Sequence, residues 1–274
     1  MQSLLGVAGL INSLASFHFL PDFPPDAYFS LDGSTLVISR SSDSSAAIKA
    51  RPPVVGIVGG IGAGKSALTR FAAEQMPLAI VDGDVVGHEA LRVSELKTRV
   101  VEAFSGILSD PSTLLVDGEI NRKVLGALIW GSDPVSRQRR STLEKTVHPW
   151  MVERFKTLFA QHQQSGQCDV IIFDAAILLE SGWDQLCDSI FYIETTDASR
   201  LERVQQQRSW NNEQLRIREE SQWPLETKKS RAKLIINNNQ PLSLAGRDFV
   251  QALQQLAARS SKPAPSHVPH VTSN

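Results

Sequence analysis

Cysteine is scarce in this 274-residue sequence, and net charge is almost absent. The two cysteines, Cys168 and Cys187, form neither a CxxC motif nor a metal-ligand spacing. This argues against a disulfide-rich secreted scaffold and predicts a reducing, cytoplasmic location. The 28 Lys and Arg residues nearly balance the 29 Asp and Glu residues, giving a net charge of −1. The whole chain therefore offers no electrostatic attraction to nucleic acid or an anionic membrane, and we expect neither partner.

The N-terminal region lacks the features of a secretion signal or a membrane span. No Lys or Arg precedes Arg40, and polar residues interrupt the short apolar runs. A Ser-rich stretch then leads to Pro52 and Pro53. We expect residues 1–53 to be an extension and linker, poorly ordered or partly helical, and residues 257–274, rich in Pro and Ser, to be a disordered tail.

Residues 54–256 alternate short apolar runs with helical patterns, which predicts an α/β domain. The runs are rich in Val and Ile on both parities, as in strands of a parallel sheet that is covered on both faces. Two insertions interrupt the alternation, a helical subdomain over about 93–148 and an Arg-rich helical lid over about 200–231. The five expected strands are residues 54–58, 78–81, 170–173, 190–193 and 234–236.

A glycine-rich segment, "GGIGAGKS", lies between the first expected strand and a helical pattern. It fits the P-loop pattern G-x-x-x-x-G-K-[ST], whose backbone N–H groups surround phosphates, with the helix N-terminus adding its positive dipole. Lys65 is expected to reach the β- and γ-phosphates and Ser66 to ligate Mg²⁺. The expected ATP-binding residues of this segment are Gly59, Gly60, Gly62, Ala63, Gly64, Lys65, Ser66 and Ala67.

Two carboxylates follow the second expected strand, where ligands of open α/β sheets bind. Asp82 and Asp84 are separated by Gly83, so in extended chain they share one face. One of them would accept a proton from an attacking hydroxyl, and the other would orient the acceptor or Mg²⁺-bound water. The structural alternative is that an Asp caps the helix starting near Val85. No N-K-x-D motif is present, so a GTPase is not indicated.

Together with the P-loop, further stretches make residues 54–239 resemble the dephospho-CoA kinases, which phosphorylate the ribose 3′-hydroxyl of dephospho-CoA. The fold implied is the three-layer P-loop NTPase fold with a five-stranded parallel sheet, an acceptor-binding helical insertion and a helical lid. The stretches that carry the resemblance are "VDGD", "DGEINRKVLGALIW", "LEKTVHPWM", "VIIFDAAILLE" and "REESQWPLETKKSRA".

The resemblance implies roles for residues outside the P-loop. Arg122 and His148 would bind the acceptor; the alternatives are that Arg122, like the neighbouring Lys123, lies on a solvated face and that His148 is structural. His148 precedes Pro149, so His148 is expected to end one helix and Pro149 to begin the next. Asp174, at the end of its strand, would hold Mg²⁺ through water or anchor a loop, and Glu180 would anchor a loop. In the lid, Arg208 and Arg218 would contact phosphates, with Arg208 acting in catalysis. Arg203 and Lys228 match other basic positions, and Asn238 lies in the loop that faces adenine.

The sequence departs from the family pattern at Lys233, Ala176 and Ala67, where Asp, Pro and Thr or Ser are usual. None of the three removes a group that phosphoryl transfer requires. We therefore expect a monomeric or weakly oligomeric kinase that uses ATP, Mg²⁺ and dephospho-CoA. A P-loop kinase for another hydroxyl, or a silent ATP-binding module, are the alternatives that remain.

Overall fold

The computed structural model describes residues 27–32, 35–40, 51–129, 131, 133–220 and 222–260. The chain divides into two compact units, Met1–Lys49 and Ala50–Asn274. In the first unit, β1 (Ala27–Asp32) pairs with β2 (Thr35–Arg40) as an antiparallel hairpin. Apart from residues 51–53, the rest of the expected N-terminal extension lies outside the described residues, as does the tail beyond residue 260, and the domain boundaries stay a prediction.

A five-stranded parallel sheet forms the centre of the second unit, as the sequence predicted. The strands run in the order β4-β7-β3-β8-β9, so β3, which leads into the glycine-rich segment, is central. Each strand lies within about one residue of its expected ends, a typical boundary error. Their bounds are β3 (Val54–Val58), β4 (Leu78–Asp82), β7 (Val170–Asp174), β8 (Ser189–Glu194) and β9 (Leu234–Asn237).

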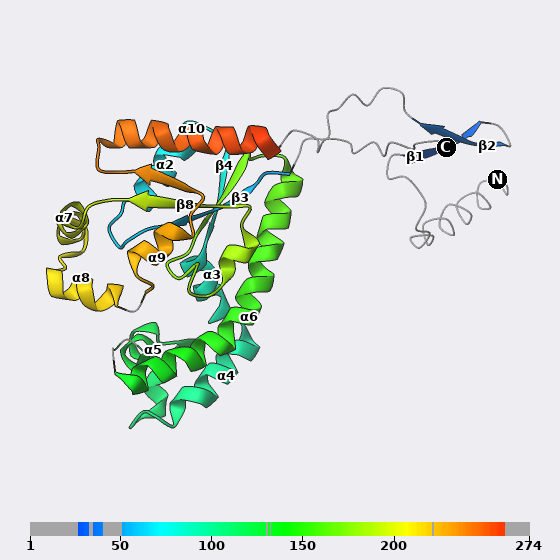
Figure 1. Cartoon of the computed structure of the whole chain (residues 1–274). Coiled ribbons are helices and arrows are strands. Elements are labelled where there is room, and N and C mark those ends of the chain that lie inside the picture. Colours follow the sequence, from blue (N-terminus) through cyan, green and yellow to red (C-terminus); the bar gives the residue numbers. More distant parts are fainter. Residues whose placement is uncertain are drawn as a thin grey trace, which may run out of the picture. The chain divides into compact units, whose positions relative to one another are not determined.

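Helices cover both faces of the sheet and make a three-layer fold (Figure 1). Side chains of β3 alternate between the two cores that result. Val55 and Ile57 belong to the core shared with α2 (Lys65–Ala73) and α10 (Leu242–Ser260), and Val54 and Val58 to the core shared with α3 (Gly83–Ala90) and α6 (Pro134–Ser165). Burial on both sides thus explains why the central strand is apolar at successive positions.

The expectation of strands covered on both faces is wrong for the two edge strands. Ile80 of β4 is 46% exposed, and Leu234 and Ile235 of β9 are 39% and 44% exposed. An edge strand has a neighbour on one side only, so the helices that cover the middle of the sheet leave part of it accessible. Sequence composition alone could not distinguish these strands from the central ones.

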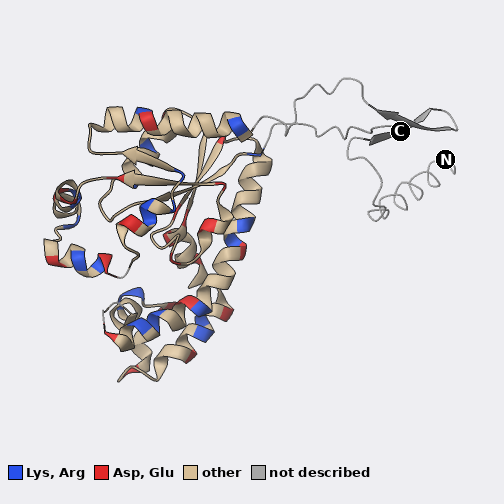
Figure 2. Ribbon diagram, in the orientation of Figure 1, with Lys and Arg blue, Asp and Glu red and all other residues tan. Residues whose placement is uncertain are grey.

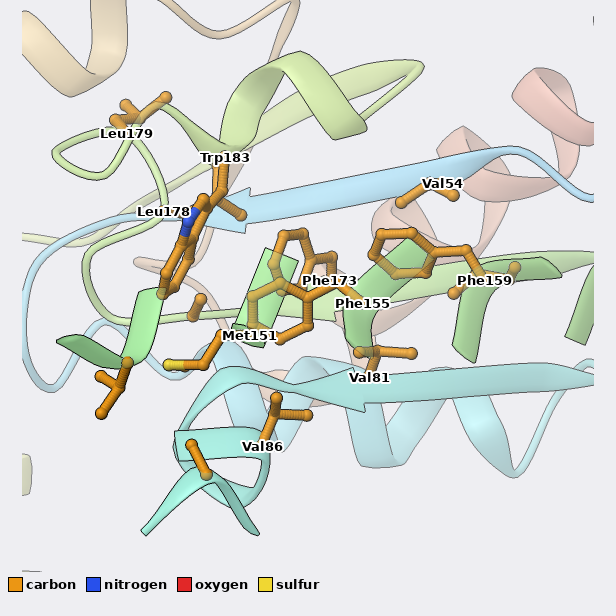
Figure 3. Packing of buried hydrophobic residues seen from close by; sticks show 14 of the residues in the cluster. Val54, Val81, Val86, Met151, Phe155, Phe159, Phe173, Leu178, Leu179 and Trp183 are labelled. Atoms are coloured by element: carbon orange, nitrogen blue, oxygen red, sulfur yellow. The ribbon is translucent and has the colours of Figure 1, made fainter. Parts of the chain in front are cut away.

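An aromatic cluster joins α6 to the sheet (Figure 3). The Phe155 ring lies 4.7 Å from the Phe173 ring of β7 and 5.0 Å from the Trp183 ring, measured between centroids. Phe159 packs edge-on against Phe173 at 5.3 Å. Such contacts between large buried rings add to the free energy gained from burying their apolar surface. The cluster fixes α6 on the sheet and therefore also fixes the position of the helical insertion at the end of α6 (Figure 1).

One helix boundary expected from the sequence is wrong. His148 and Pro149 were expected to separate two helices, but α6 runs through both positions. Proline removes one main-chain hydrogen bond from a helix interior, which costs about 3 kcal/mol. Val147, Met151 and Phe155 lie four residues apart on both sides of Pro149 and are all buried in one core. Their packing outweighs the local preference for a break.

The inserted subdomain and the lid have the helical character that the sequence predicted. The insertion lies at one end of α6, away from the sheet (Figure 1). Within the described ranges, every helix is too short or too polar to cross a bilayer. The insertion comprises α4 (Ser94–Ser105), η1 (Pro111–Leu114), β5 (Leu115–Val116), β6 (Glu119–Ile120), α5 (Arg122–Ile129) and the start of α6. The lid comprises α7 (Asp197–Arg208), α8 (Asn212–Glu219) and α9 (Leu225–Ser230). A short segment outside both, η2 (Trp183–Leu186), follows β7.

Candidate active site

The segment from Gly59 to Ser66 forms a tight loop between β3 and α2. Gly59, Gly62 and Gly64 have φ angles of 153°, 78° and 88°, a region that side chains with a Cβ rarely adopt. The Lys65 side chain folds back over the loop, and its ammonium group donates a hydrogen bond to the Gly59 carbonyl at 3.3 Å. Ser66 is exposed in the first turn of α2, and Ala67 follows it. This is the conformation that lets successive N–H groups face a phosphate.

Polar side chains from other parts of the domain donate hydrogen bonds to the main chain of this loop. The Ala63 carbonyl accepts hydrogen bonds from Asn238 Nδ2 at 2.7 Å, Thr195 Oγ1 at 2.9 Å and Arg203 Nη1 at 3.1 Å. Asn238, Thr195 and Ala63 are each less than 10% exposed. The predicted ATP-binding residue Asn238 therefore contacts the loop main chain directly. Gly64 has no room for a side chain, since a Cβ there would lie 2.4 Å from Asn238 Nδ2.

Arg200, for which the sequence suggested no role, is buried and only 3% exposed. Its guanidinium donates to the Ile61 carbonyl at 3.3 Å and pairs with Asp197 at 2.7 Å and with Glu219 of α8. It thus links the P-loop to the lid. A signal was present: Arg200, like Val204, lies on the inward face of a helix that Thr196 caps.

The acidic residues gather at the carboxyl edge of the sheet. Asp82 ends β4 and is in register with Asp174, which ends the neighbouring β7. Asp82 Oδ1 accepts the N–H groups of Asp84 at 2.7 Å and of Val85 at 3.1 Å, so Asp82 caps α3. Asp84 lies in the first turn of α3 and lines the large cavity described below. The two carboxylates therefore have different surroundings.

The charges at this edge perturb one another. Desolvation raises the pKa of the Asp84 carboxyl, and the nearby Asp82 charge raises it further. Desolvation also raises the pKa of Asp174, although the Lys65 ammonium opposes that shift. Burial lowers the pKa of Lys65, opposed by Asp174. Groups whose pKa values are displaced in this way are typical of functional sites.

A cavity of about 920 Å³ joins the P-loop to the insertion and the lid. Ile61 and Gly62 of the P-loop and Asp84 are part of its wall. Figure 2 marks the Lys and Arg positions in blue on the ribbons of α5 and α8, which both contribute residues to this wall. Cations of the wall outnumber its acids, Asp84 and Glu220, so the cavity favours an anionic ligand. The cations are Arg122, Lys123, Arg137, Arg140, Arg208 and Arg218.

Three of these six cations were proposed for the site from the sequence, Lys123 was considered as a solvated surface residue, and two were not considered. Arg122, Arg208 and Arg218 were expected at the site, and the structure brings them to one cavity. Arg137 and Arg140 come from the exposed-looking start of α6. Arg140 donates to the Ile129 carbonyl at 3.2 Å and to the Gly131 carbonyl at 3.1 Å. Only the folding of α5 against α6 brings these two arginines to the cavity.

His148 and Arg122 lie on the acceptor side of Asp84. The His148 ring packs edge-on against Trp183 at 4.9 Å, and burial lowers its pKa. It lines a small cavity of about 270 Å³ that Asp84 also reaches. Arg122 Nη1 donates to Nε2 of His88, 2.8 Å away. His88 was not singled out in the sequence, and it joins the end of α3 to the start of α5.

Several positions have structural roles instead of contacts with the large cavity. Lys228 is 2% exposed and pairs with Glu180 at 2.9 Å. Glu180 also accepts the N–H of Trp223 at 2.8 Å, so it anchors a loop, as the sequence suggested. Lys233 is exposed, and its main-chain N–H donates to the Ile190 carbonyl at 2.9 Å. The departure from the family pattern at Lys233 therefore leaves the start of β9 in place.

Oxygen donors that suit a hard divalent cation are present near the loop. Ser66 follows Lys65 at the P-loop, and Asp174 ends the strand that pairs with β3. Within the described residues, no group of three or more His, Cys, Asp or Glu side chains could form a metal centre of its own. Magnesium usually binds proteins through one or two side chains, waters and substrate phosphates, so this sparse donor set fits it.

A comparison with protein families decides the relationship. A family model described as dephospho-CoA kinase matches residues 53–243. The chain belongs to the dephospho-CoA kinase family. The match includes the P-loop, both carboxylate strands, the insertion and the lid, so the family resemblance noted in the sequence is confirmed.

Individual relatives of the dephospho-CoA kinase family agree with this assignment. The chain is 31% identical over 186 residues to a dephospho-CoA kinase of Dehalococcoides mccartyi, covering 68% of this chain and 88% of the relative. It is 29% identical over 201 residues to that of Geobacillus kaustophilus, covering 73% and 95%. The crystal structure of TT1252 from Thermus thermophilus superimposes with a TM-score of 0.59 at 25% identity, covering 76% of this chain and 98% of that one.

Proposed function

We propose that this protein transfers the γ-phosphoryl group of ATP to the ribose 3′-hydroxyl of dephospho-CoA, forming coenzyme A and ADP. The observation that carries the proposal is the position of Asp84, in the wall of one cationic cavity together with the P-loop. A hydroxyl bound beside Asp84 would face the phosphate held by the loop. Membership of the dephospho-CoA kinase family supports this choice of acceptor.

The P-loop side binds ATP. The N–H groups from Gly59 to Ser66 surround the phosphates, and the Lys65 ammonium leaves the Gly59 carbonyl to contact the β- and γ-phosphates. Asn238 maintains the shape of the loop through the Ala63 carbonyl. The Ser66 hydroxyl and Asp174 would hold Mg²⁺, Asp174 through water, and the ion would neutralise negative charge on the phosphates.

Asp84 accepts the proton of the acceptor hydroxyl. Asp82 is less suited, because its Oδ1 already accepts two main-chain N–H groups at the start of α3. Desolvation and the neighbouring Asp82 raise the pKa of Asp84, which makes its carboxylate a stronger base than that of an ordinary Asp. Asp82 positions Asp84 by capping the helix that carries it.

Cations on both sides of the cavity bind the remaining negative charge. Arg208 and Arg218 of the lid contact the transferring phosphoryl group, where positive charge stabilises the transition state. Arg122 contacts the pyrophosphate of the acceptor, and His148 borders the small cavity beside Asp84. We also propose a cytoplasmic location, in line with the two cysteines, and no nucleic-acid or membrane partner, in line with the net charge of −1. A monomer or weak oligomer stays a prediction.

An acceptor-dependence assay tests the proposal. Purified protein is incubated with Mg-ATP and dephospho-CoA, AMP or no acceptor, and ADP is measured, with Lys65→Ala as the background control. ADP that forms only with dephospho-CoA is the expected result. ADP formation with another acceptor alone would indicate a different P-loop kinase, and ATP binding without turnover would indicate a silent module. Either outcome would contradict the proposal.

A further inference from the structure

Arg200 of α7 packs closely against the P-loop. A Cβ on Gly60 would lie 2.6 Å from Arg200 Nη1, and a Cβ on Gly62 would lie 2.7 Å from the Arg200 carbonyl oxygen. The guanidinium also donates to the Ile61 carbonyl at 3.3 Å. Three successive residues of the loop are therefore in contact with one arginine, and Ile61 and Gly62 line the large cavity. The position of Arg200 is tied to the conformation of the loop.

The same guanidinium is the point at which helix α8 meets the P-loop. Glu219, the last residue of α8, pairs with Nη1 of Arg200, and that nitrogen also donates to Ile61. Nη2 pairs with Asp197 at 2.7 Å, within α7 itself. The Asp197 side chain is 91% exposed and that of Glu219 only 28% exposed. One nitrogen thus joins the P-loop to the end of α8, at the less exposed of the two ion pairs.

Helix α8 is only lightly packed against the rest of the domain. It lies beside α7 at the periphery of the domain (Figure 1). Of its eight residues, all of them described, Leu215 alone is buried. Arg216 pairs with Glu213 and Glu220, so these charges connect α8 to itself and to the residue that follows it. The placement of α8 therefore depends strongly on Leu215 and on the pair of Glu219 with Arg200.

The ion pair also determines where Arg218 lies. Successive residues of an α-helix point about 100° apart, so a Glu219 that faces Arg200 leaves Arg218 on the adjoining face of α8. That face lines the large cavity, to which Arg218 and Ile217 both contribute. Within the described part of the chain, neither Arg200 nor Glu219 lines this cavity. The pair can therefore act on the site only through the residues that it holds.

Stability alone does not account for this buried pair. The Nε atom of Arg200 is buried and has no hydrogen-bond partner among the described residues. A buried charge with an unsatisfied N–H recovers little of its desolvation cost, so such a pair is a weak source of stability. Its geometry instead fixes the distance between two elements of the site.

We propose that Arg200 and Glu219 are a positioning pair that couples ATP binding at the P-loop to the placement of α8 and of Arg218. The inference deepens the proposed function, and the kinetic part of its test rests on that function. When a triphosphate binds the loop, the Ile61 carbonyl and the Arg200 guanidinium adjust together, and Glu219 moves α8 with them. Coupling between two sites is reciprocal, so loss of the pair must also weaken the binding of ATP.

Substitution of Glu219 tests the coupling without leaving the buried arginine unpaired. Glu219→Gln removes the charge from α8, and Asp197 remains paired with Arg200. This variant is expected to raise the KM for ATP about tenfold and to lower kcat about threefold or more at an unchanged melting temperature. Glu213→Gln is the matched control, because Glu213 also pairs with an arginine, Arg216 at 2.8 Å, but within α8. It should change neither value.

A double-mutant cycle tests whether the two residues act as a pair. Arg200→Gln, Glu219→Gln and the double variant are compared by kcat/KM for ATP, with the melting temperature as the check on folding. The double variant should lose no more than Arg200→Gln alone, because one interaction can be removed only once. Losses that multiply would show that the residues act independently and would overturn the proposal.

Protection from trypsin measures the placement of α8 without any acceptor. With Mg²⁺ and a saturating non-hydrolysable ATP analogue, cleavage after Arg216 and Arg218 should slow about fivefold in the unmodified protein and in Glu213→Gln. In Glu219→Gln the analogue should have little effect, which a merely structural role of Glu219 would not produce. Equal protection of both variants, or no protection of the unmodified protein, would overturn the positioning role. Protection without turnover of dephospho-CoA in the unmodified protein would support the pair and refute the proposed function alone.

Discussion

The guanidinium carbon of Arg218 lies 3.9 Å from the centre of the Trp210 ring. The guanidinium carbon of Arg208 lies 4.8 Å from the same ring. One indole therefore contacts both lid arginines that the sequence suggested for phosphate binding, and all three side chains line the large cavity. A cation over an aromatic face gains about 0.5–2 kcal/mol, depending on its exposure to water. Trp210 thus acts as a positioning residue for two charges.

Replacement of Trp210 tests this positioning. Trp210→Ala is expected to lower kcat by roughly tenfold, which corresponds to about 1.4 kcal/mol, because the two arginines lose their common support. Trp210→Phe keeps an aromatic face and should restore most of the rate. Steady-state kinetics with a melting-temperature measurement check the result. Equal activity of the Ala variant, or no rescue by Phe, would show that the indole does not position the arginines.

Asp84 makes activity depend on pH in a defined direction. A general base must be ionised, and the pKa of Asp84 is raised above its ordinary value of 3.8 by desolvation and by Asp82. Activity should therefore be complete well above the raised pKa and be lost as the pH falls through it. The acid limb of kcat/KM against pH should lie above pH 3.8. Asp82→Asn should move that limb toward lower pH, because it removes a negative charge beside Asp84.

Asn238 should affect both ATP binding and stability. Its buried amide donates to the Ala63 carbonyl at 2.7 Å. Asn238→Ala removes that donor and is expected to cost about 1–3 kcal/mol in unfolding free energy, with a raised KM for ATP. Denaturant titration and ATP-dependent kinetics check both effects. Asn212→Ala, at an exposed position of α8, is the matched control. Identical stability of the two variants would contradict the structural role of Asn238.

Cys187 should be unreactive in the native protein. Burial, with smaller contributions from Asp184 and Asp188, raises the pKa of its thiol to about 12. The thiolate is the nucleophile, so at pH 8 almost none is available. Incubation with iodoacetamide followed by mass spectrometry should find Cys187 largely unmodified until denaturant is added. Rapid alkylation of the native protein would contradict this environment.

Much of the fold was predictable because its signals are local. The sheet strands are short Val- and Ile-rich runs between helical patterns, and all five were located from sequence. The P-loop was equally clear from its local sequence pattern. Its glycines are needed because the loop has positive φ angles, such as 78° at Gly62. Pro149 was misleading because a local preference was outweighed by the packing of Val147, Met151 and Phe155 in the core.

The parts of the site that could not be predicted depend on tertiary contacts. Arg200 looks like a surface residue in an Arg-rich helix, but the folded chain buries it between Ile61 and Glu219. Arg137 and Arg140 reach the cavity only because α6 packs against α5. The difference between Asp82 and Asp84 also required the structure, since both lie at the start of the same helix, where Asp82 caps it and Asp84 lies in its first turn.

The most direct test of the central claim compares Asp84→Asn with Asp82→Asn in acceptor-dependent ADP formation. Both variants keep the size of the side chain and remove one charge. With Mg-ATP and saturating dephospho-CoA, Asp84→Asn should lose about 10²–10⁴-fold in kcat at an unchanged melting temperature, the usual contribution of a general base. Asp82→Asn should retain much more of its kcat. Near-normal turnover by Asp84→Asn would contradict the claim that Asp84 activates the acceptor hydroxyl opposite the P-loop.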